Sequence, residues 1–376
     1  MIRIASLVPY RVMPAKMGGQ KAIYFFLKYF SRHCEVICYT TKNNTEQSDE
    51  PFIVKKILGT YKLRYINPAY FFKLNNEFRK EKITHLLMEQ PYYGWLAILL
   101  KITTGVKLII HSHNIEGLRF RSTGKWWWRM MSWYESAVHK KADFNFFITE
   151  EDLLHGVKNF GIPKEKCAVI TYGTEKNTAP PVEEKKAAKK EICSQLGIAG
   201  DNYLLLYNGT LNYPPNKKGL DYILEHINPM LLQQKDIRYT IIICGPLLSP
   251  EYNELKEYRD RNIVYAGFVN EIDIYFKAAD IFINPVTAGG GIKTKLVEAL
   301  AAGCSAVSFV NGAIGVPVAI TGNKLRIVPD HDIKAFSKNI IAAAESVEDR
   351  IPVDFFNHFY WDNIAKQASD IIKIKL

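Results

Sequence analysis

The stretch IFINPVTAGGGIKTKLVEALAAG, residues 281–303, joins a short apolar run to three consecutive glycines and then to an amphipathic segment. The apolar run has the length of a buried strand, and the segment after the glycines has the spacing of a helix. Glycines let a backbone approach a ligand closely, and the free N–H groups of a helix N-terminus attract anions. Lys293 and Lys295 stand in the predicted first turn, where a cation disfavours the helix itself. The stretch therefore predicts a strand, a loop that binds an anion such as phosphate, and a helix.

The same alternation of apolar runs and amphipathic stretches extends along the chain on both sides of this segment. Strands that alternate with helices imply parallel sheets joined by right-handed crossovers. A chain of 376 residues exceeds what one hydrophobic core serves. We therefore predict an α/β protein with two doubly wound, Rossmann-like domains that face each other across a cleft. The predicted strands are 2–8, 35–40, 83–88, 107–111, 144–148, 203–207, 239–244, 281–284 and 305–309, and the predicted helices include 22–31, 126–139, 219–232, 295–302 and 333–345.

A polar, proline-containing stretch near the midpoint, NTAPPVEEKKAAKK (177–190), interrupts the alternation. Such a composition is typical of a linker that leads into a helix. We therefore place an N-terminal domain at 1–175, a linker at 176–186 and a C-terminal domain at 187–350. The remaining segment, 351–376, is expected to form a C-terminal helix that packs back on the N-terminal domain.

The formal net charge of +11 arises in the N-terminal half of the chain. Residues 1–175 hold 26 Lys and Arg against 15 Asp and Glu, whereas 176–376 hold 23 of each kind. One-sided basicity is typical of an anionic partner, such as a phosphorylated acceptor or an anionic membrane surface, and equally of a merely soluble basic surface. A nucleic-acid-binding protein is a rival interpretation. The chain carries no recognised nucleic-acid-binding motif, so we expect no nucleic-acid partner.

The six cysteines form no Cys-x-x-Cys pair and are typical of small core residues in a reducing compartment. No apolar run has the length needed to span a bilayer. These features predict a cytoplasmic protein.

A tryptophan-rich basic segment, GLRFRSTGKWWWRMMSWYESAVHKK (117–141), extends this prediction to the inner face of the membrane. On helical spacing Trp126, Met130 and Trp133 share one face, and lysines and arginines surround them. Aromatic rings settle at the boundary between water and lipid, while basic side chains reach anionic headgroups. The segment therefore predicts peripheral membrane binding. Packing in the protein core is the alternative for any single tryptophan.

Two further groups in the C-terminal half extend the predicted anion site. Gly209 allows a tight exit from a strand, and Lys217 and Lys218 stand where the next helix begins. These lysines could neutralise a diphosphate, although a solvated charge pair is the better interpretation for one of the two. Glu298 is a lone acid in the apolar stretch LVEALAA, so it either pairs with a cation or accepts hydrogen bonds from ligand hydroxyls such as those of a ribose.

The N-terminal half carries two weaker signals. Gly18 and Gly19 follow the first strand and its loop and open a helix, which is half of a phosphate-loop pattern. In IIHSHNIEG, His111, His113 and Asn114 lie at the carboxyl end of a predicted strand, the edge where open parallel sheets bind ligands. A His-x-His pair can also bind metal, but the sequence shows no further ligand cluster beside it, so no metal site is expected.

These segments, taken in this order, resemble the retaining glycosyltransferases of family 4, also called group 1, which have the GT-B architecture. The resemblance covers essentially the whole chain. It implies a metal-independent, hexosyltransferase-like enzyme that moves a sugar from a nucleotide-diphosphate sugar to a glycan or lipid-linked acceptor in cell-surface polysaccharide synthesis, with no cofactor besides the donor substrate. The matching segments are the Gly-Gly loop, HNIE (113–116), the Tyr-Glu pair before KKAD, NGTLNYPPN (208–216), ICGP (243–246), YAGFV (265–269), the glycine-rich loop with its helix, and FYWDNIA (359–365).

Carried over by position, the resemblance assigns the nucleotide sugar to the C-terminal domain and the acceptor to the N-terminal domain. Lys218, Lys293 and His113 are the expected catalytic residues, and Glu298 is expected to hold the ribose. The glycine-loop amides are expected to meet the donor diphosphate, and the backbone near the YAGFV segment to meet the base. The other residues assigned to the donor pocket are Gly209, Thr210, Gly245, Phe268, Val269, Gly290, Gly291, Ile292 and Lys295, and those on the acceptor side are Gly18, Gly19 and Asn114.

Two positions depart from the family pattern. Gly290 stands where the family has a glutamate that holds the donor sugar, and Thr210 stands where an arginine is usual. We expect Lys293 to replace the missing positive charge. The departures leave two other functions open: a catalytically impaired subunit that binds nucleotide, and a nucleotide-sugar epimerase of the same fold.

Overall fold

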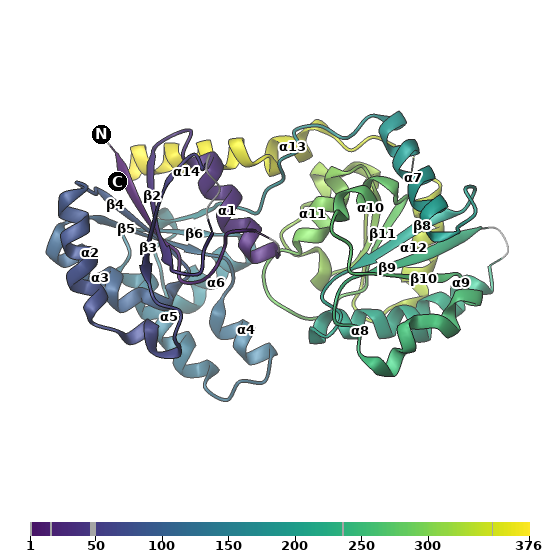
Figure 1. Cartoon of the computed structure of the whole chain (residues 1–376), viewed down its shortest axis with the longest axis horizontal. Helices are drawn as coiled ribbons and strands as arrows, with labels where there is room; N and C mark the ends of the chain where they lie inside the picture. The colour runs from purple at the N-terminus through teal and green to yellow at the C-terminus, as the bar shows by residue number, and fades with distance from the viewer. Residues whose placement is uncertain (1, 16, 46–49, 235–236, 348) are drawn as a thin grey trace. The chain divides into compact units, whose positions relative to one another are not determined.

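The computed structural model describes residues 2–15, 17–45, 50–234, 237–347 and 349–376. The chain forms two compact units, Met1–Glu175 with His358–Leu376, and Lys176–Asn357 (Figure 1). Each unit contains one parallel sheet with helices between its strands. The predicted α/β class with two doubly wound domains is therefore confirmed.

The first unit is built on a parallel sheet in the order β3-β2-β1-β4-β5-β6-β7. The strand order reverses between β1 and β4, and in open parallel sheets a ligand crevice lies at the carboxyl ends of the strands at such a point. Its strands are β1 (Arg3–Leu7), β2 (Glu35–Thr41), β3 (Ile53–Leu58), β4 (His85–Glu89), β5 (Lys107–Ser112), β6 (Phe144–Phe147) and β7 (Cys167–Val169), and its helices are α1 (Gly18–Phe30), α2 (Ala69–Lys80), α3 (Gly94–Thr104), α4 (Glu116–Ser122), α5 (Trp128–Lys141), α6 (Glu150–Phe160) and α14 (Trp361–Lys375).

The last helix of the chain, α14, packs against α1 in the first unit (Figure 1). Its first residue, Trp361, is buried, and its N–H group donates to the carbonyl of Thr174 over 3.1 Å. A Cβ on Gly173 would stand 2.5 Å from the Trp361 ring, so only glycine fits beneath the indole. The apolar face of α14 thus packs the C-terminal segment of the chain against the first unit.

The second unit is built on a parallel sheet in the order β10-β9-β8-β11-β12-β13, which reverses between β8 and β11. Its strands are β8 (Tyr203–Asn208), β9 (Tyr239–Cys244), β10 (Ile263–Gly267), β11 (Ile281–Asn284), β12 (Ser305–Phe309) and β13 (Leu325–Val328). Its helices are α7 (Val182–Leu196), α8 (Pro214–Tyr222), α9 (Asn228–Leu232), α10 (Ile272–Ala278), α11 (Thr294–Ala301), α12 (Ile333–Ala344) and α13 (Val353–Phe359), which crosses the unit boundary.

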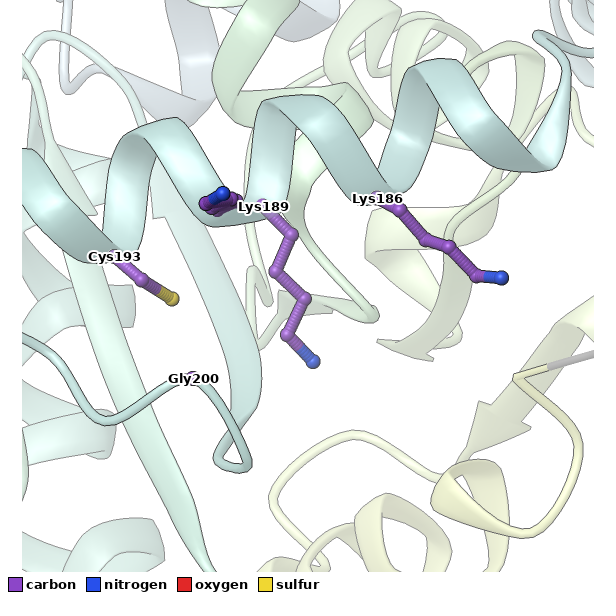
Figure 2. Close-up of a pocket in the computed structure, with 5 residues that line it drawn as sticks. Lys186, Lys189, Cys193 and Gly200 are labelled. Carbon is purple, nitrogen blue, oxygen red and sulfur yellow. The ribbon is translucent and has the colours of Figure 1, made fainter.

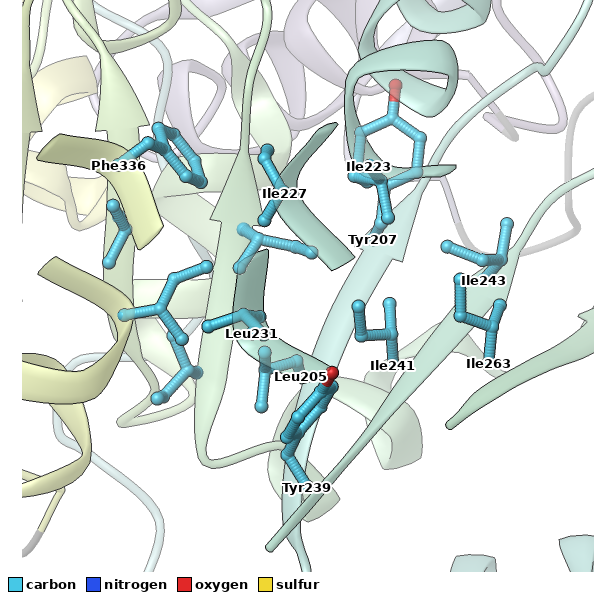
Figure 3. Close-up of a cluster of buried hydrophobic side chains, with 14 of the residues drawn as sticks. Leu205, Tyr207, Ile223, Ile227, Leu231, Tyr239, Ile241, Ile243, Ile263 and Phe336 are labelled. Atoms are coloured by element: carbon cyan, nitrogen blue, oxygen red, sulfur yellow. The ribbon is translucent and has the colours of Figure 1, made fainter. Parts of the chain in front are cut away.

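Branched aliphatic side chains fill the core of the second unit (Figure 3). Ile241 and Ile243 on β9 and Leu205 on β8 pack against Ile227 and Leu231, which follow α8. All five are buried, and full burial of each such side chain stabilises the fold by about 1.5–3 kcal/mol. This core holds the strand ends that carry the candidate site.

Helix α7 begins at Val182, inside the segment 176–186 that the sequence predicts as a linker. Pro181 occupies its N-cap position, and Glu183 and Glu184 stand in its first turn, where acids complement the helix dipole. The Glu, Lys and Ala residues of the segment are also strong helix formers. The segment predicted as a linker therefore contains the first residues of a helix. Within the residues that the structure describes, no helix is both long and apolar enough to cross a membrane.

Candidate functional site

The carboxyl ends of β8 and β11 lie next to each other where the strand order of the second sheet reverses. Gly209 and Thr210 follow β8, and the loop 285–293 follows β11 and leads into α11. Open parallel sheets bind ligands at such positions. The sheet topology therefore brings together the two loops that the sequence predicts as an anion site.

Close backbone contacts hold this edge together. The Gly245 N–H group donates to the Gly267 carbonyl over 2.8 Å, and the Gly209 N–H group donates to the Cys244 carbonyl over 3.0 Å. Gly245 has a φ of 149°, and a Cβ there would stand 1.7 Å from the Gly209 carbonyl oxygen. The exits of β8 and β9 thus leave no room for a side chain at Gly245.

Lys295 lies against the same backbone. A Cβ on Gly209 would stand 2.4 Å from Lys295 Nζ, so the ammonium occupies the space above this glycine. Burial, together with nearby Lys293, lowers the pKa of Lys295 to about 8, against the opposing effect of Glu298. Because an anion favours the charged form of a nearby amine, a bound phosphate would counteract this shift.

Lys293 braces the glycine loop from the N-cap position of α11. Its Nζ donates to the carbonyl oxygens of Gly289 over 3.0 Å and Gly291 over 3.1 Å. These two glycines have φ values of 95° and 64°, a region that side-chain-bearing residues rarely adopt. Gly290 lies between them and is exposed. Glycines thus allow the backbone conformation of the loop, and Lys293 holds it by hydrogen bonds to the loop carbonyl groups.

The two lysines that follow β8 differ in their surroundings. Lys217 Nζ forms an ion pair with Glu251 over 2.6 Å. Lys218 is exposed, and its Nζ lies 5.8 Å from the centroid of the Tyr222 ring. Lys217 is therefore the member of the pair engaged in a solvated ion pair, and Lys218 remains the candidate phosphate ligand.

The other residues assigned to the donor pocket lie in the loops after β10 and β11 or on α11. Phe268 directly follows β10, next to the Gly267 carbonyl that accepts from Gly245, and the residue is 64% exposed. Val269 comes next in the chain. Ile292 is half-buried in the glycine loop, and Glu298 is half-buried on α11.

A different set of residues occupies the corresponding edge of the first unit. Glu89 ends β4 and pairs in register with His111 on β5, and His113 follows two residues later. Glu89 Oε2 lies 2.7 Å from His113 Nε2 and 3.0 Å from His111 Nδ1. All three side chains are buried, and one potential metal-ligand atom from each lies within 4.8 Å of the others. This edge therefore concentrates ionisable side chains.

The electrostatics of this trio follow from burial and mutual charge. Burial by itself would raise the pKa of Glu89, but the two adjacent histidines outweigh it and lower the pKa to about 2. Burial lowers the pKa of His113, and His111 adds to this effect, while Glu89 opposes it. The carboxylate is thus ionised at neutral pH, and His113 favours the neutral form.

Sequence reasoning missed Glu89. It found no further ligand beside His111 and His113, and the structure supplies one from the neighbouring strand. Glu89 lies 22 residues before His111, and only the pairing of β4 with β5 brings them together. The available signal is an acid at the end of an otherwise apolar strand, HLLME, because a buried carboxylate needs a partner.

The HNIE segment is held in place by a network of its own. Glu135 on α5 accepts hydrogen bonds from the N–H groups of Glu116 over 2.9 Å and Gly117 over 3.0 Å, and burial raises the pKa of Glu135 to about 8. Glu116 accepts from Arg119 over 2.9 Å and from the Tyr92 hydroxyl over 2.7 Å. These contacts fix the start of α4, three residues after His113.

The remaining acceptor-side residues are less constrained. Asn114 accepts a hydrogen bond at its backbone carbonyl from the Ser112 hydroxyl over 2.8 Å. Gly18 opens α1, and a Cβ on Gly19 would meet no atom within 4 Å. The packing of the protein itself therefore does not require glycine at position 19.

A pocket of about 320 Å³ lies elsewhere in the second unit (Figure 2). Lys186, Lys189, Lys190 and Cys193 of α7 line it, with Gly200 on the following loop. Lys189 is neutralised by Asp280 over 2.7 Å. None of the residues predicted to bind a ligand lines this pocket.

Comparison with known proteins finds two matching family models, one in each half of the chain. The model described as Glycosyltransferase Family 4 matches residues 18–176, and the model described as Glycosyl transferases group 1 matches residues 202–346.

Two curated relatives are also named as glycosyltransferases. An uncharacterised glycosyltransferase of Methanocaldococcus jannaschii is 26% identical over 231 residues, which are 58% of this chain and 56% of the relative. A chitobiosyldiphosphodolichol beta-mannosyltransferase of Debaryomyces hansenii is 25% identical over 317 residues, which are 78% of this chain and 65% of the relative. Both matches thus span less than two thirds of the relative's own length.

Among solved structures, Anabaena HepE in complex with UDP aligns with a TM-score of 0.75 over 99% of this chain and 100% of its own, at 14% identity. The same protein in complex with UDP-glucose aligns with a TM-score of 0.71 at 14% identity, over 100% of both chains. At this identity the likeness establishes the fold. The two family models and the shared fold together show that the chain belongs to the family 4, or group 1, glycosyltransferases of GT-B architecture.

Proposed function

We propose that the chain transfers a sugar from a nucleotide-diphosphate sugar to a glycan or lipid-linked acceptor in cell-surface polysaccharide synthesis. The observation that carries this proposal is the convergence of the glycine loop, the start of α11 and the Lys295 ammonium where β8 and β11 end. Backbone N–H groups and lysines are the groups that bind phosphate in proteins. Uridine nucleotides are the first donors to test, because HepE was solved with UDP and with UDP-glucose.

The proposed chemistry places the leaving diphosphate in the second unit. Negative charge grows on the diphosphate as the bond to the sugar breaks, and Lys218, Lys293 and the glycine-loop amides stabilise it. This stabilisation requires no metal. The acceptor hydroxyl attacks on the face that the leaving group vacates, so the configuration at the sugar carbon is retained, and its proton passes to the departing diphosphate oxygen. The family resemblance assigns His113 to recognition of the transferred sugar.

A double variant tests this assignment. Lys218→Ala combined with Lys293→Ala should weaken UDP binding by a factor of at least ~100, because each lost charge-assisted contact costs about 1.5–3 kcal/mol. Uridine, which carries no phosphate, should bind within about threefold of its wild-type affinity. Isothermal titration calorimetry with both ligands measures the difference.

The control for the double variant is Lys186→Ala, which removes an exposed lysine of α7 outside the candidate site. It should leave both affinities unchanged. Equal losses of UDP and uridine affinity in the double variant would refute the assignment of these lysines to the diphosphate.

A catalytically impaired, nucleotide-binding subunit is the second candidate, and the absence of a side chain at Gly290 favours it. Gly290 is exposed and does not have a positive φ, so a glutamate fits there without backbone strain. If the chain binds donor and transfers no sugar to any acceptor or to water, the impaired subunit is the correct assignment. In that case Gly290→Glu should tighten binding of the nucleotide sugar relative to the free nucleotide diphosphate.

We also propose that the first unit binds the inner face of an anionic membrane. Trp126, Met130 and Trp133 are exposed by 88%, 65% and 74%, so these large apolar side chains face solvent. Arg121 and Arg129 flank them and stack on Trp128, 5.1 Å and 5.3 Å from its ring. Apolar rings beside arginines are the combination that docks on anionic lipid.

Vesicle sedimentation tests the membrane proposal. Phosphatidylglycerol vesicles should pull down the protein at low salt and release most of it at high salt, and Trp126→Ala with Trp133→Ala should weaken binding about tenfold. Phe72→Ala removes another exposed aromatic ring of the first unit and serves as the control. If the wild-type protein stays in the supernatant at low salt, a soluble acceptor is favoured instead.

A further inference from the structure

The trio at the ligand edge of the first unit contains a carboxylate that the proposed chemistry does not use. Glu89 is fully buried at the end of β4, and His113 is 8% exposed. The two meet over 2.7 Å between Glu89 Oε2 and His113 Nε2. A buried carboxylate is costly unless it is paired, so its presence here requires a local reason.

The pairing fixes the tautomer of His113. An ionised carboxylate can only accept hydrogen bonds, so the proton of neutral His113 must reside on Nε2, the nitrogen that faces Glu89. The other ring nitrogen, Nδ1, then carries a lone pair. Within the described residues this buried Nδ1 has no hydrogen-bond partner. A buried acceptor without a partner is unfavourable, and a ligand hydroxyl would supply the missing donor.

A metal ion is the other occupant that this trio could hold. Metal-bound histidines almost always use the second ring nitrogen to donate to a carboxylate or a carbonyl. Here His111 Nε2 and His113 Nδ1, the nitrogens that would point away from the metal, both lack hydrogen-bond partners in the part of the chain that the structure describes. The second shell of a metal site is therefore missing, and the geometry favours a hydrogen-bonded pair.

The other titratable groups around His113 do not replace Glu89 as its hydrogen-bond partner. Glu116 is engaged by Arg119 and Tyr92, and His111 faces the same Glu89 oxygen as His113 does. The further titratable neighbours are Tyr10 on the loop after β1, whose pKa is raised by burial and by Glu89, and Cys38 on β2, whose pKa is raised in the same way. Glu89 is thus the carboxylate that contacts His113 directly.

We propose that Glu89 is a positioning residue that holds His113 with its Nε2 proton toward the carboxylate and its Nδ1 lone pair toward a hydroxyl of the sugar being transferred or of its acceptor. This inference rests on the proposed function, because that function supplies the hydroxyl. It adds a residue that the family resemblance did not assign.

The first test reads the tautomer directly and does not depend on activity. Two-dimensional long-range 1H–15N NMR of the full chain, labelled with 15N-histidine and assigned with His113→Gln, should show His113 protonated on Nε2. In Glu89→Gln the two tautomers should become mixed, because the amide can donate as well as accept. A His113 that is protonated on Nδ1 in the wild-type protein overturns the proposal, as does one equivalent of tightly bound metal in the purified protein.

The second test compares kinetics with a matched control. Glu89→Ala and Glu89→Gln should lower kcat by at least tenfold, leave UDP affinity within twofold, and move the acidic limb of the pH profile of kcat. The control is Asn145→Ala, which removes the partner of another buried histidine of the same unit, His139, over 2.8 Å. It should leave kcat within twofold of wild type.

Two outcomes of these tests have distinct meanings. If Glu89→Ala behaves like Asn145→Ala in folding, kcat and pH profile, Glu89 is merely structural and the proposal fails. If the wild-type protein transfers no sugar, the proposed function fails, and the NMR tautomer alone then decides the orientation of His113. Glu89→Gln, which keeps the size of the side chain, covers the case in which Glu89→Ala does not fold.

Discussion

The two sheets of this chain reverse their strand order in the same way but present opposite chemistry at the point of reversal. In the second unit the edge is made of glycine backbone with Lys293 and Lys295. In the first unit it is made of Glu89 and two histidines, all buried. Backbone N–H groups and ammonium groups suit a phosphate whose charge is fixed, whereas a carboxylate–imidazole pair suits a neutral hydroxyl. One topology thus presents two kinds of ligand site.

The largest expected effect comes from filling the backbone contact of the second unit. Gly245→Ala places a Cβ 1.7 Å from the Gly209 carbonyl oxygen, at a φ that alanine rarely adopts. We expect a loss of about 3 kcal/mol or more in the free energy of unfolding of this unit. Urea denaturation followed by fluorescence measures it.

The matched control is Gly200→Ala, where a Cβ would meet no atom within 4 Å. This variant should stay within about 0.5 kcal/mol of wild type. If Gly245→Ala is equally harmless, the close approach of the two strand exits does not shape the donor site.

The next largest effect concerns the positive charge of Lys295. Lys295→Met should weaken UDP binding about 10- to 100-fold, the cost of one charge-assisted contact. Because burial lowers the pKa of Lys295 to about 8, the wild-type affinity should be full below pH 8 and fall as pH rises through that value. Calorimetry between pH 7 and pH 9 should show this slope in the wild type and a flat profile in Lys295→Met. A slope that persists in the variant assigns the titration to another group.

A smaller effect is expected from the acid on α11. Glu298→Gln should lower the affinity for the nucleotide about tenfold while leaving thermal stability without ligand unchanged, since the residue is assigned to the ribose. Thermal shift with and without UDP measures both quantities. If the variant loses stability without ligand and binds UDP normally, Glu298 serves an internal ion pair, for which Lys295 is the nearby cation.

The smallest effect should come from the glycine pair of the first unit. Gly19 lies in α1 with open space around its Cα, so Gly19→Ala should stabilise the helix by about 0.5–1 kcal/mol and leave UDP affinity unchanged. This outcome sharpens the contrast with Gly245. A large loss of UDP binding in Gly19→Ala would instead place the nucleotide against the first unit.

The sequence predicted the inner strands of both sheets but not the outermost strands. The strands absent from the prediction, β3, β7, β10 and β13, are the outermost strands of the two sheets. Central strands of parallel sheets are buried on both faces and appear as continuous apolar runs. An outer strand such as β3, IVKKIL, is partly exposed and carries lysines, so its apolar signal is weak.

The candidate sites divide in the same way. The donor edge was predictable because its glycines, lysines and Glu298 lie within one short stretch, so local pattern carried the signal. The Glu89–His113 contact was not predictable, because it depends on the order of strands in the sheet. The ion pair that removes Lys217 from the candidate ligands depends on Glu251, which lies 34 residues away in the chain.

Hydrogen–deuterium exchange of the full chain with and without UDP tests the central claim most directly. If the diphosphate binds where β8 and β11 end, amide exchange should slow in 285–298 and in 209–219 on addition of UDP. Segments around Glu89 and His113 should change less, because the sugar and the acceptor are absent. Protection confined to the first unit, or no protection by UDP or any other nucleotide diphosphate at millimolar concentration, would contradict the account.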